Sequence, residues 1–224
     1  MELPVAPVLP LRTERLFLRQ FQPDDLEPLL VIHSDPGAVR YVPYPPRDRA
    51  AVTTVLEQKR TSTVLRQEGD LVELAVTLAE DGTLVGDVLL ALRSVEHETL
   101  EVGYVFSPAH GGRGYATEAV QALLDLAFGG LGARRVVARV DARNAPSRAL
   151  LERLGVRREA HLVENQWFKG ELTSEVDYAV LAREWAATPG RGSFPTLGNG
   201  PRERAAGPRG RGQGPQGTGH LRRP

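Results

Sequence analysis

Three glycines in four positions, at residues 111, 112 and 114, make the stretch of this sequence best suited to holding a ligand. The loop also contains Arg113, and from Tyr115 onward apolar residues recur at helical spacing. A glycine-rich turn that opens a helix presents several free backbone N–H groups beside the positive end of the helix dipole. The pattern therefore suits a phosphate or pyrophosphate group, although glycines also occur in tight turns that need positive φ.

The two common nucleotide motifs do not fit this loop. A P-loop requires Lys-Ser or Lys-Thr after its last glycine, and Tyr115-Ala116 follows Gly114 here. A dinucleotide fingerprint that started at Gly112 would require glycine or alanine at Thr117. It would also require an acidic residue about 20 positions further on, where Arg134 and Arg135 stand.

The loop resembles that of the GNAT N-acetyltransferases, whose acetyl-CoA loop has the form Gln/Arg-x-x-Gly-x-Gly/Ala. Gly114 and Ala116 fit the last two anchor positions, but Gly111 replaces the first Gln or Arg, so one side-chain anchor is missing. Tyr115 to Ala119 (YATEA) resembles the RimJ/RimL branch, which acetylates ribosomal-protein N-termini. The resemblance extends from about Leu11 to Trp185. It implies acetyl-CoA as cosubstrate, held by Tyr104, Val105, Phe106, Gly111, Gly112, Arg113, Gly114, Tyr115, Ala116, Asn144 and Ser147.

Acyl transfer to an amine benefits from a base, because most aliphatic amines are protonated at neutral pH. Glu101 is the first candidate, since it lies on the apolar strand that leads into the glycine loop. On a strand it shares a face with Gly103 and Val105, where partial desolvation would favour proton uptake. The alternative is a structural ion pair with Arg139 or another neighbour. Glu164, near the end of a later strand, is the second candidate, and a water chain is the third.

Asn144 and Ser147 match the Asn-x-x-Ser of the RimJ/RimL branch. The resemblance implies that they contact pantetheine and that Ser147 protonates the leaving thiolate. Helix capping by Asn144 is expected in either case. Many GNAT enzymes carry a tyrosine four residues after this serine, but Leu151 occupies that position, so the acid role passes to Ser147 or to water.

The elements that must position these residues form a mixed α/β (α+β) chain. The patterns predict about six to seven strands and about four helices, and the resemblance implies that they form a GNAT fold with a mixed, mostly antiparallel sheet. Asn165 to Gly170 is expected to be the loop between the last two strands. Tyr41 and Tyr44, in a proline-rich loop between two early helices, are candidates for substrate contact or for simple packing.

Composition narrows the class of protein further. The 224 residues include no cysteine, which excludes thiol catalysis and cysteine-based zinc sites, and the five histidines show no metal-ligand spacing. We therefore expect no metal. The sequence also contains no 18-residue apolar stretch and no basic signal segment, so we expect no membrane insertion and a cytoplasmic location.

The formal net charge of zero conceals two unlike regions. Residues 189–224 contain ten glycines, six prolines and seven arginines but one acid, Glu203, so this segment carries about +6 and residues 1–188 about −6. Such a composition predicts a disordered tail after an acetyltransferase domain. Any nucleic-acid binding would come through this basic tail, and the alternative is a solvated extension without function.

Three functions are compatible with these patterns. The first is acetylation of a primary amine, a protein N-terminal α-amine before others, by direct attack on acetyl-CoA. The second is acetylation of a small-molecule amine such as an antibiotic or a polyamine. The third is a CoA-binding or RNA-associated module without turnover. We expect a monomer or a homodimer in each case.

Truncation after Thr188 is the first test of this organisation. Because the tail has little apolar surface to bury, the shortened protein should keep its melting temperature and its CoA affinity. Thermal unfolding and calorimetry of both forms measure the two quantities. A clear fall in melting temperature would show that the tail packs on the domain.

Overall fold

The computed structural model describes residues 1–188; the predicted tail lies outside the described residues. The strands are β1 (Leu11–Arg12), β2 (Leu16–Arg19), β3 (Leu71–Leu78), β4 (Leu84–Ser94), β5 (Thr99–Phe106), β6 (Arg135–Asp141), β7 (Arg157–Phe168) and β8 (Glu171–Leu181). The α-helices are α1 (Leu26–His33), α2 (Arg49–Thr61), α3 (Tyr115–Asp125), α4 (Ala145–Arg153) and α5 (Ala182–Ala186). Short helical turns are η1 (Pro23–Asp25), η2 (Pro108–His110) and the π-type η3 (Leu126–Gly130).

All eight strands form one sheet in the order β1-β2-β3-β4-β5-β6-β8-β7. Every neighbouring pair is antiparallel except β5 and β6, which are parallel. The mixed α/β fold class is confirmed, with one strand and one helix more than the upper expectation. The additional elements are short: β1 has two residues and α5 has five, too few to produce a period in the sequence.

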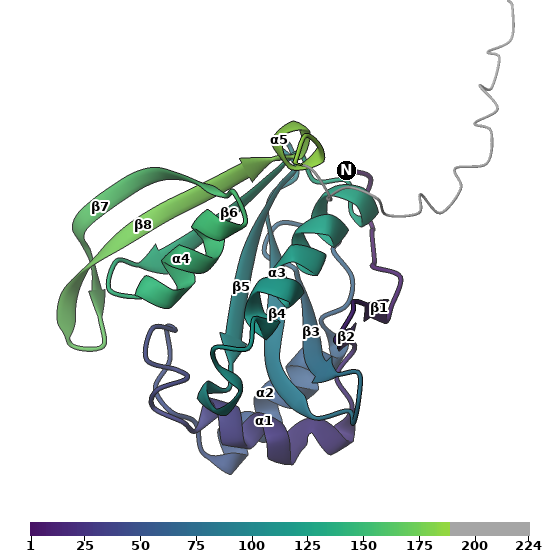
Figure 1. Cartoon of the computed structure of the whole chain (residues 1–224), viewed down its shortest axis with the longest axis vertical. Helices are drawn as coiled ribbons and strands as arrows, with labels where there is room; N and C mark the ends of the chain where they lie inside the picture. Colours follow the sequence, from purple (N-terminus) through teal and green to yellow (C-terminus); the bar gives the residue numbers. More distant parts are fainter. Residues whose placement is uncertain (189–224) are drawn as a thin grey trace, which may run out of the picture.

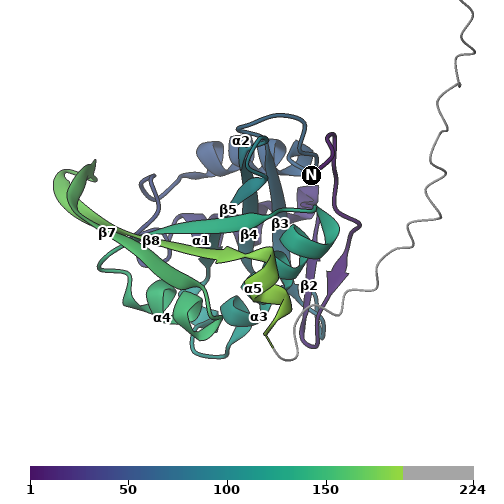
Figure 2. The same cartoon turned by 90° about the horizontal axis from the view of Figure 1, so that it is seen from above.

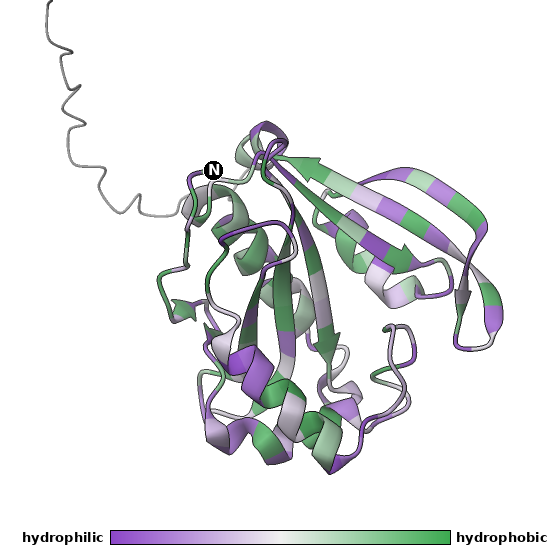
Figure 3. Cartoon of the chain, turned by 180° about the vertical axis from the view of Figure 1, so that it is seen from behind, coloured by the Kyte–Doolittle hydropathy of each residue, from purple (hydrophilic) through white to green (hydrophobic). Residues whose placement is uncertain are grey.

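Helices cover the two faces of the sheet differently. Figure 2 shows α1 and α2 on one side and α3, α4 and α5 on the other. Strand alternation divides the core in the same way: Val102 belongs to the larger cluster with α3, and Val105 to the smaller cluster with α1 and α2. Figure 3 shows the central strands mostly hydrophobic and hydropathy alternating along β7 and β8. Along β5, therefore, even-numbered and odd-numbered residues point to opposite faces of the sheet.

The last hairpin differs from the sequence prediction. Residues 165–168 are not a loop, because β7 continues to Phe168 and β8 begins at Glu171, with Lys169 and Gly170 as a two-residue turn of positive φ. The register shifts between Leu162 and Gln166, where Glu164 has φ 47°. A polar stretch with a bulge lacks strict alternation, which is why the sequence pattern ended too early.

No helix within residues 1–188 is both long enough and apolar enough to cross a bilayer.

Gly86 on β4 offers a test of this packing. A methyl group there would lie 2.5 Å from the Phe106 ring and 2.6 Å from the Val105 carbonyl oxygen. Relief of this clash would require a shift of the backbone, which costs free energy. Gly86→Ala should therefore lower the free energy of unfolding by about 1–3 kcal/mol in urea titrations. Gly103→Ala is the matched control, because its methyl would meet only the flexible Leu89 side chain, nearest at 3.1 Å. Equal losses in the two variants would contradict the backbone clash.

Candidate active site

Strands β5 and β6 separate after three paired residues. Thr99, Leu100 and Glu101 pair with Arg135, Val136 and Val137, and beyond them the two strands diverge, as Figure 1 shows. The backbone of β5 from Val102 to Phe106 consequently has no strand partner on that side among residues 1–188. Its N–H and C=O groups can serve an extended ligand that inserts as a strand would.

The glycine loop lies at the end of β5 and leads directly into α3. Gly112 has φ 74° and Gly114, the N-cap of α3, has φ 83°, so both adopt the left-handed conformation that glycine tolerates. Within the described chain, no hydrogen bond occupies the N–H groups of Gly112, Arg113 or Gly114. A Cβ on Gly112 would meet nothing within 4 Å, so its backbone is open to a close ligand. These free donors at a helix start fit the pyrophosphate of CoA.

Tyr104 and Ser147 form a hydrogen bond across the mouth between the diverging strands. Their hydroxyl oxygens are 2.5 Å apart, and Ser147 lies in the first turn of α4, where the Asn144 side chain accepts from its N–H. Burial raises the pKa of Tyr104 to about 12, so its hydroxyl stays protonated at neutral pH and can donate a hydrogen bond. The predicted helix cap at Asn144 is present, and the hydroxyl of Tyr104 on β5 lies next to Ser147.

Glu101 is held between two arginines. Its Oε2 accepts from Arg93 Nε at 2.8 Å and lies 3.6 Å from Arg139 Nε, and 16% of the side chain is exposed. The predicted face is correct, because Glu101 lies on the side of Val105 with α1 and α2. The ion pair with Arg139 that the sequence left open is present, and both arginines contact the same carboxylate oxygen.

The second candidate base lies elsewhere. Glu164 is exposed, in the register shift of β7, and its N–H donates to Ser174 Oγ at 2.9 Å. On the neighbouring strand, burial raises the pKa of Glu175, and the charge of Asp177 raises it further. Glu175 also senses the charge of Glu101, so β5 and β8 together bring carboxylates to the α1/α2 side of the sheet.

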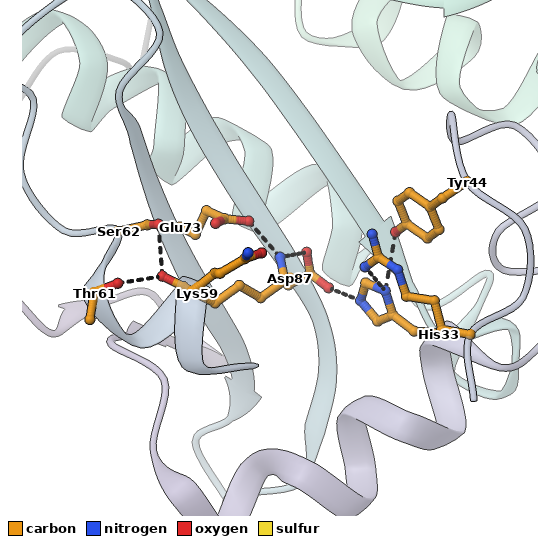
Figure 4. Close-up of polar contacts among 9 residues, drawn as sticks. His33, Tyr44, Lys59, Thr61, Ser62, Glu73 and Asp87 are labelled. Carbon is orange, nitrogen blue, oxygen red and sulfur yellow. Dashed lines mark hydrogen bonds and ion pairs between the residues drawn. The ribbon is translucent and has the colours of Figure 1, made fainter. Parts of the chain in front are cut away.

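A buried polar network that sequence reasoning did not identify anchors α1 and α2 to the sheet (Figure 4). His33 Nε2 lies 2.7 Å from Asp87 Oδ2, and Lys59 Nζ donates to Asp87 Oδ1 at 3.0 Å and to Glu73 Oε1 at 2.6 Å. All four side chains are 10% exposed or less. Each comes from a different element: α1, α2, β3 and β4.

The network extends to the proline-rich loop through His33. Arg47 Nη1 lies 3.4 Å from His33 Nδ1, and the Tyr44 hydroxyl lies 3.1 Å from the same atom. Since arginine can only donate, Nδ1 accepts and the ring proton lies on Nε2, facing Asp87. Burial, with the charge of Asp87 second, raises the pKa of Tyr44 to about 12. Tyr44 therefore stacks on the ring of His33 and is hydrogen-bonded to it, on the side of the sheet that α1 and α2 cover. The guanidinium of Arg40 lies over the ring of Tyr41.

Contacts with groups of opposite charge outweigh the effect of burial on the pKa values in this network. Burial alone would raise the pKa of Asp87, but Lys59 and His33 outweigh it and hold that pKa at about 2. Burial likewise opposes the charge of Lys59, and the carboxylates of Asp87 and Glu73 overcome it and raise its pKa. The sequence did carry one signal of this network, which is Asp87 inside the otherwise apolar run LVGDVLLAL.

The described residues contain no cluster of three or more His, Asp or Glu side chains that could hold a metal ion. The diverging strands and the amide-lined loop fit the class that the sequence resemblance implied, an acyltransferase that binds an extended thioester cofactor. The chain belongs to the acetyltransferase (GNAT) domain family, whose model matches residues 15–157. The enzyme is therefore a GNAT N-acetyltransferase, and enzymes of this family use acetyl-CoA.

Relatives support this assignment over most of the chain. "Uncharacterized N-acetyltransferase YnaD" of Bacillus subtilis is 31% identical over 179 residues, which cover 77% of this chain and 97% of that protein. "Putative ribosomal N-acetyltransferase YdaF" of Bacillus subtilis is 28% identical, covering 77% of this chain and 94% of its own. A GNAT-family acetyltransferase structure from Bacillus anthracis has a TM-score of 0.71 at 28% identity, covering 79% of this chain and all of that one.

A more distant structure shares the fold. It is spermidine N-acetyltransferase from Vibrio cholerae in complex with CoA and spermine, with a TM-score of 0.65 and 22% identity, covering 77% of this chain and 98% of that one.

Asp87→Asn tests the buried network. The folded pKa of about 2 is below the ordinary 3.8, so the charge of Asp87 stabilises the fold above pH 3.8, and this contribution is lost as pH falls toward 2. At pH 7 the variant should lose about 3 kcal/mol of unfolding free energy, because Lys59 keeps only one carboxylate. Urea unfolding from pH 7 to pH 3 should show the difference shrinking with acid. Glu27→Gln, in an exposed ion pair with Arg49, is the control and should change stability little.

Proposed function

We propose that this N-acetyltransferase acts on a protein N-terminal α-amine. The observation that carries the reaction is the unpaired edge of β5 ending at a glycine loop with free amides. The acceptor class is supported by the YATEA segment at Tyr115 to Ala119, which resembles the RimJ/RimL branch, and by the name of the YdaF relative. An α-amine also suits the reaction because more of it is neutral at pH 7 than of a lysine side chain.

Bound acetyl-CoA supplies a thioester whose carbonyl carbon can accept the amine. Gly111, Gly112, Arg113, Gly114, Tyr115 and Ala116 would hold the pyrophosphate, and the β5 backbone at Tyr104, Val105 and Phe106, with Asn144 and Ser147, would hold the pantetheine arm. Glu101 takes the amine proton, directly or through water. The amine then forms the C–N bond as the C–S bond breaks, and the new amide nitrogen gives its surplus proton to solvent. Ser147, hydrogen-bonded to Tyr104, gives a proton to the thiolate and regains one from solvent.

A second acceptor class, a polyamine, has its own support. Glu101, Glu175 and Asp177 interact electrostatically on the α1/α2 side of the sheet and would attract a multiply charged amine. The Vibrio cholerae structure of the same fold contains spermine. Thiol release from acetyl-CoA, measured with N-terminal peptides and with spermidine, separates the two: faster turnover of spermidine than of every peptide would reverse the preference. Binding of CoA without thiol release for any amine would favour the non-catalytic module.

Glu101→Gln tests the base. The substitution keeps the shape of the side chain but removes the proton acceptor, so turnover should fall roughly 10²-fold or more near neutral pH while CoA affinity changes little. Raising the pH should recover part of the loss, because more of the amine is already neutral. Steady-state kinetics and calorimetry measure the two effects. Full activity would transfer the role to Glu164 or to a water chain.

Ser147→Ala tests the proton donor. Its effect on turnover should be smaller than that of Glu101→Gln, because water can protonate a thiolate whose ordinary pKa is about 8.5. Stopped-flow measurement of thiol release gives the comparison. A loss larger than that of the Glu101 variant would make Ser147 the more important catalytic residue.

A further inference from the structure

The glycine loop is held from outside by an arginine that lies about a hundred residues earlier in the chain. Arg15, just before β2, donates from Nη1 to the Arg113 carbonyl oxygen at 2.9 Å. Its guanidinium carbon lies 4.9 Å from the centre of the Tyr115 ring. Its Nη2 lies 3.3 Å from the position that a Cβ on Gly114 would take. One side chain thus contacts three consecutive residues of the loop and helix start.

Arg15 is itself fixed by Glu118 on the first turn of α3. Glu118 Oε2 accepts a hydrogen bond from Arg15 Nε at 2.7 Å and forms an ion pair with Nη2 at the same distance. Glu118 Oε1 accepts from the backbone N–H of Arg15 at 2.8 Å. Thr13 Oγ1 also donates to Oε1, at 2.6 Å. Burial would raise the pKa of Glu118, but these donors outweigh it and lower that pKa. Glu118 therefore stays ionised at neutral pH and keeps the guanidinium in one orientation.

The contact with Arg113 sets the direction of a peptide group. In a trans peptide the C=O of Arg113 and the N–H of Gly114 point in opposite directions. Because Arg15 binds the carbonyl oxygen on one side, the Gly114 N–H is directed to the other side and stays unpaired in the described structure. A peptide between flexible residues would otherwise rotate freely, and its fixation lowers the entropy lost when an anion binds.

Arg15 also keeps donors free for a ligand. Of its five N–H groups, one on each of the three nitrogens is engaged by Glu118 or Arg113, and the other two have no partner within the described residues. The side chain is 45% exposed and lines a groove of about 520 Å³ with Gly114, Thr117 and Arg153. Arg153 Nη1 donates to Thr117 Oγ1 at 3.3 Å in the same groove. Arg15 precedes β2 and Arg153 ends α4, and both lie beside the loop that lacks a side-chain anchor at Gly111.

We propose that Arg15, oriented by Glu118, is a positioning residue for CoA that replaces the missing anchor at Gly111 by fixing the Arg113–Gly114 peptide toward the pyrophosphate. The inference rests on the proposed cofactor site. It adds a residue outside the loop motif, from the opposite end of the domain sequence, to the determinants of CoA affinity.

Calorimetric binding of CoA and of pantetheine, which lacks the pyrophosphate, tests the proposal without catalysis. Arg15→Ala should weaken CoA binding by about tenfold to a hundredfold, the effect of losing a charge-assisted contact. Pantetheine binding should not change. Arg15→Lys should lose most of this affinity too, because one ammonium cannot serve both Glu118 and the Arg113 carbonyl. Glu118→Gln should show a loss of several fold, because a neutral amide holds the guanidinium less firmly.

Arg49→Ala is the matched control, since Arg49 forms a comparable exposed pair with Glu27 away from the loop, and its CoA affinity should equal that of the wild type. Unchanged CoA affinity in Arg15→Ala would overturn the proposal. An equal loss for pantetheine would also overturn it, because general damage to the domain would then be the cause. Retention of full affinity in Arg15→Lys at low salt would show that charge alone acts, against a role in peptide orientation. No CoA binding by the wild type would reject the cofactor site itself.

Discussion

Only three residue pairs join the two halves of the sheet, and the site depends on that short junction. Strands β1 to β5 form one half and β6, β8 and β7 the other, with β5 and β6 paired at Thr99 to Glu101 alone. The halves stay together because the large core cluster is continuous beneath α3 and α4 and includes side chains of both. Helix packing on one face therefore allows the strands to separate without opening the core. The exposed β5 edge is the consequence, and its unpaired backbone groups are available to a ligand.

The other face of the sheet is held by charge rather than by a large apolar cluster. Lys59 contacts Asp87 and Glu73, and His33 contacts Asp87, so buried polar side chains connect α1 and α2 to β3 and β4. Burying such groups costs free energy, so the network specifies where the helices sit more than it adds stability. The proline-rich loop follows from this position, because Tyr44 and Arg47 contact the ring of His33. This face of the sheet thus presents polar groups of defined orientation.

Local sequence signals predicted the parts of the site that depend on backbone conformation. The glycines before Tyr115, the cap at Asn144 and the apolar run into Phe106 each specify their own dihedral angles or their own period, within a few residues of the chain. The strand parity that put Glu101 on the face of Val105 was predictable for the same reason. The β7–β8 hairpin was misjudged at residues 165–168, where a bulge and a two-residue turn interrupt alternation in a polar segment. Two short elements, β1 and α5, had no local period to detect.

The sequence by itself determined the glycine loop, the helix starts and the strand faces, because these follow from glycine conformations, capping groups and periodicity. Only the tertiary structure decided which side chains meet. Arg15 reaches Arg113 across 98 positions, and Tyr104 reaches Ser147 across 43. Glu101 meets Arg93 and Arg139 because β4 and β6 lie on either side of β5. Such contacts depend on strand order and helix placement, which are set by packing over the whole domain, so no local pattern of residues encodes them.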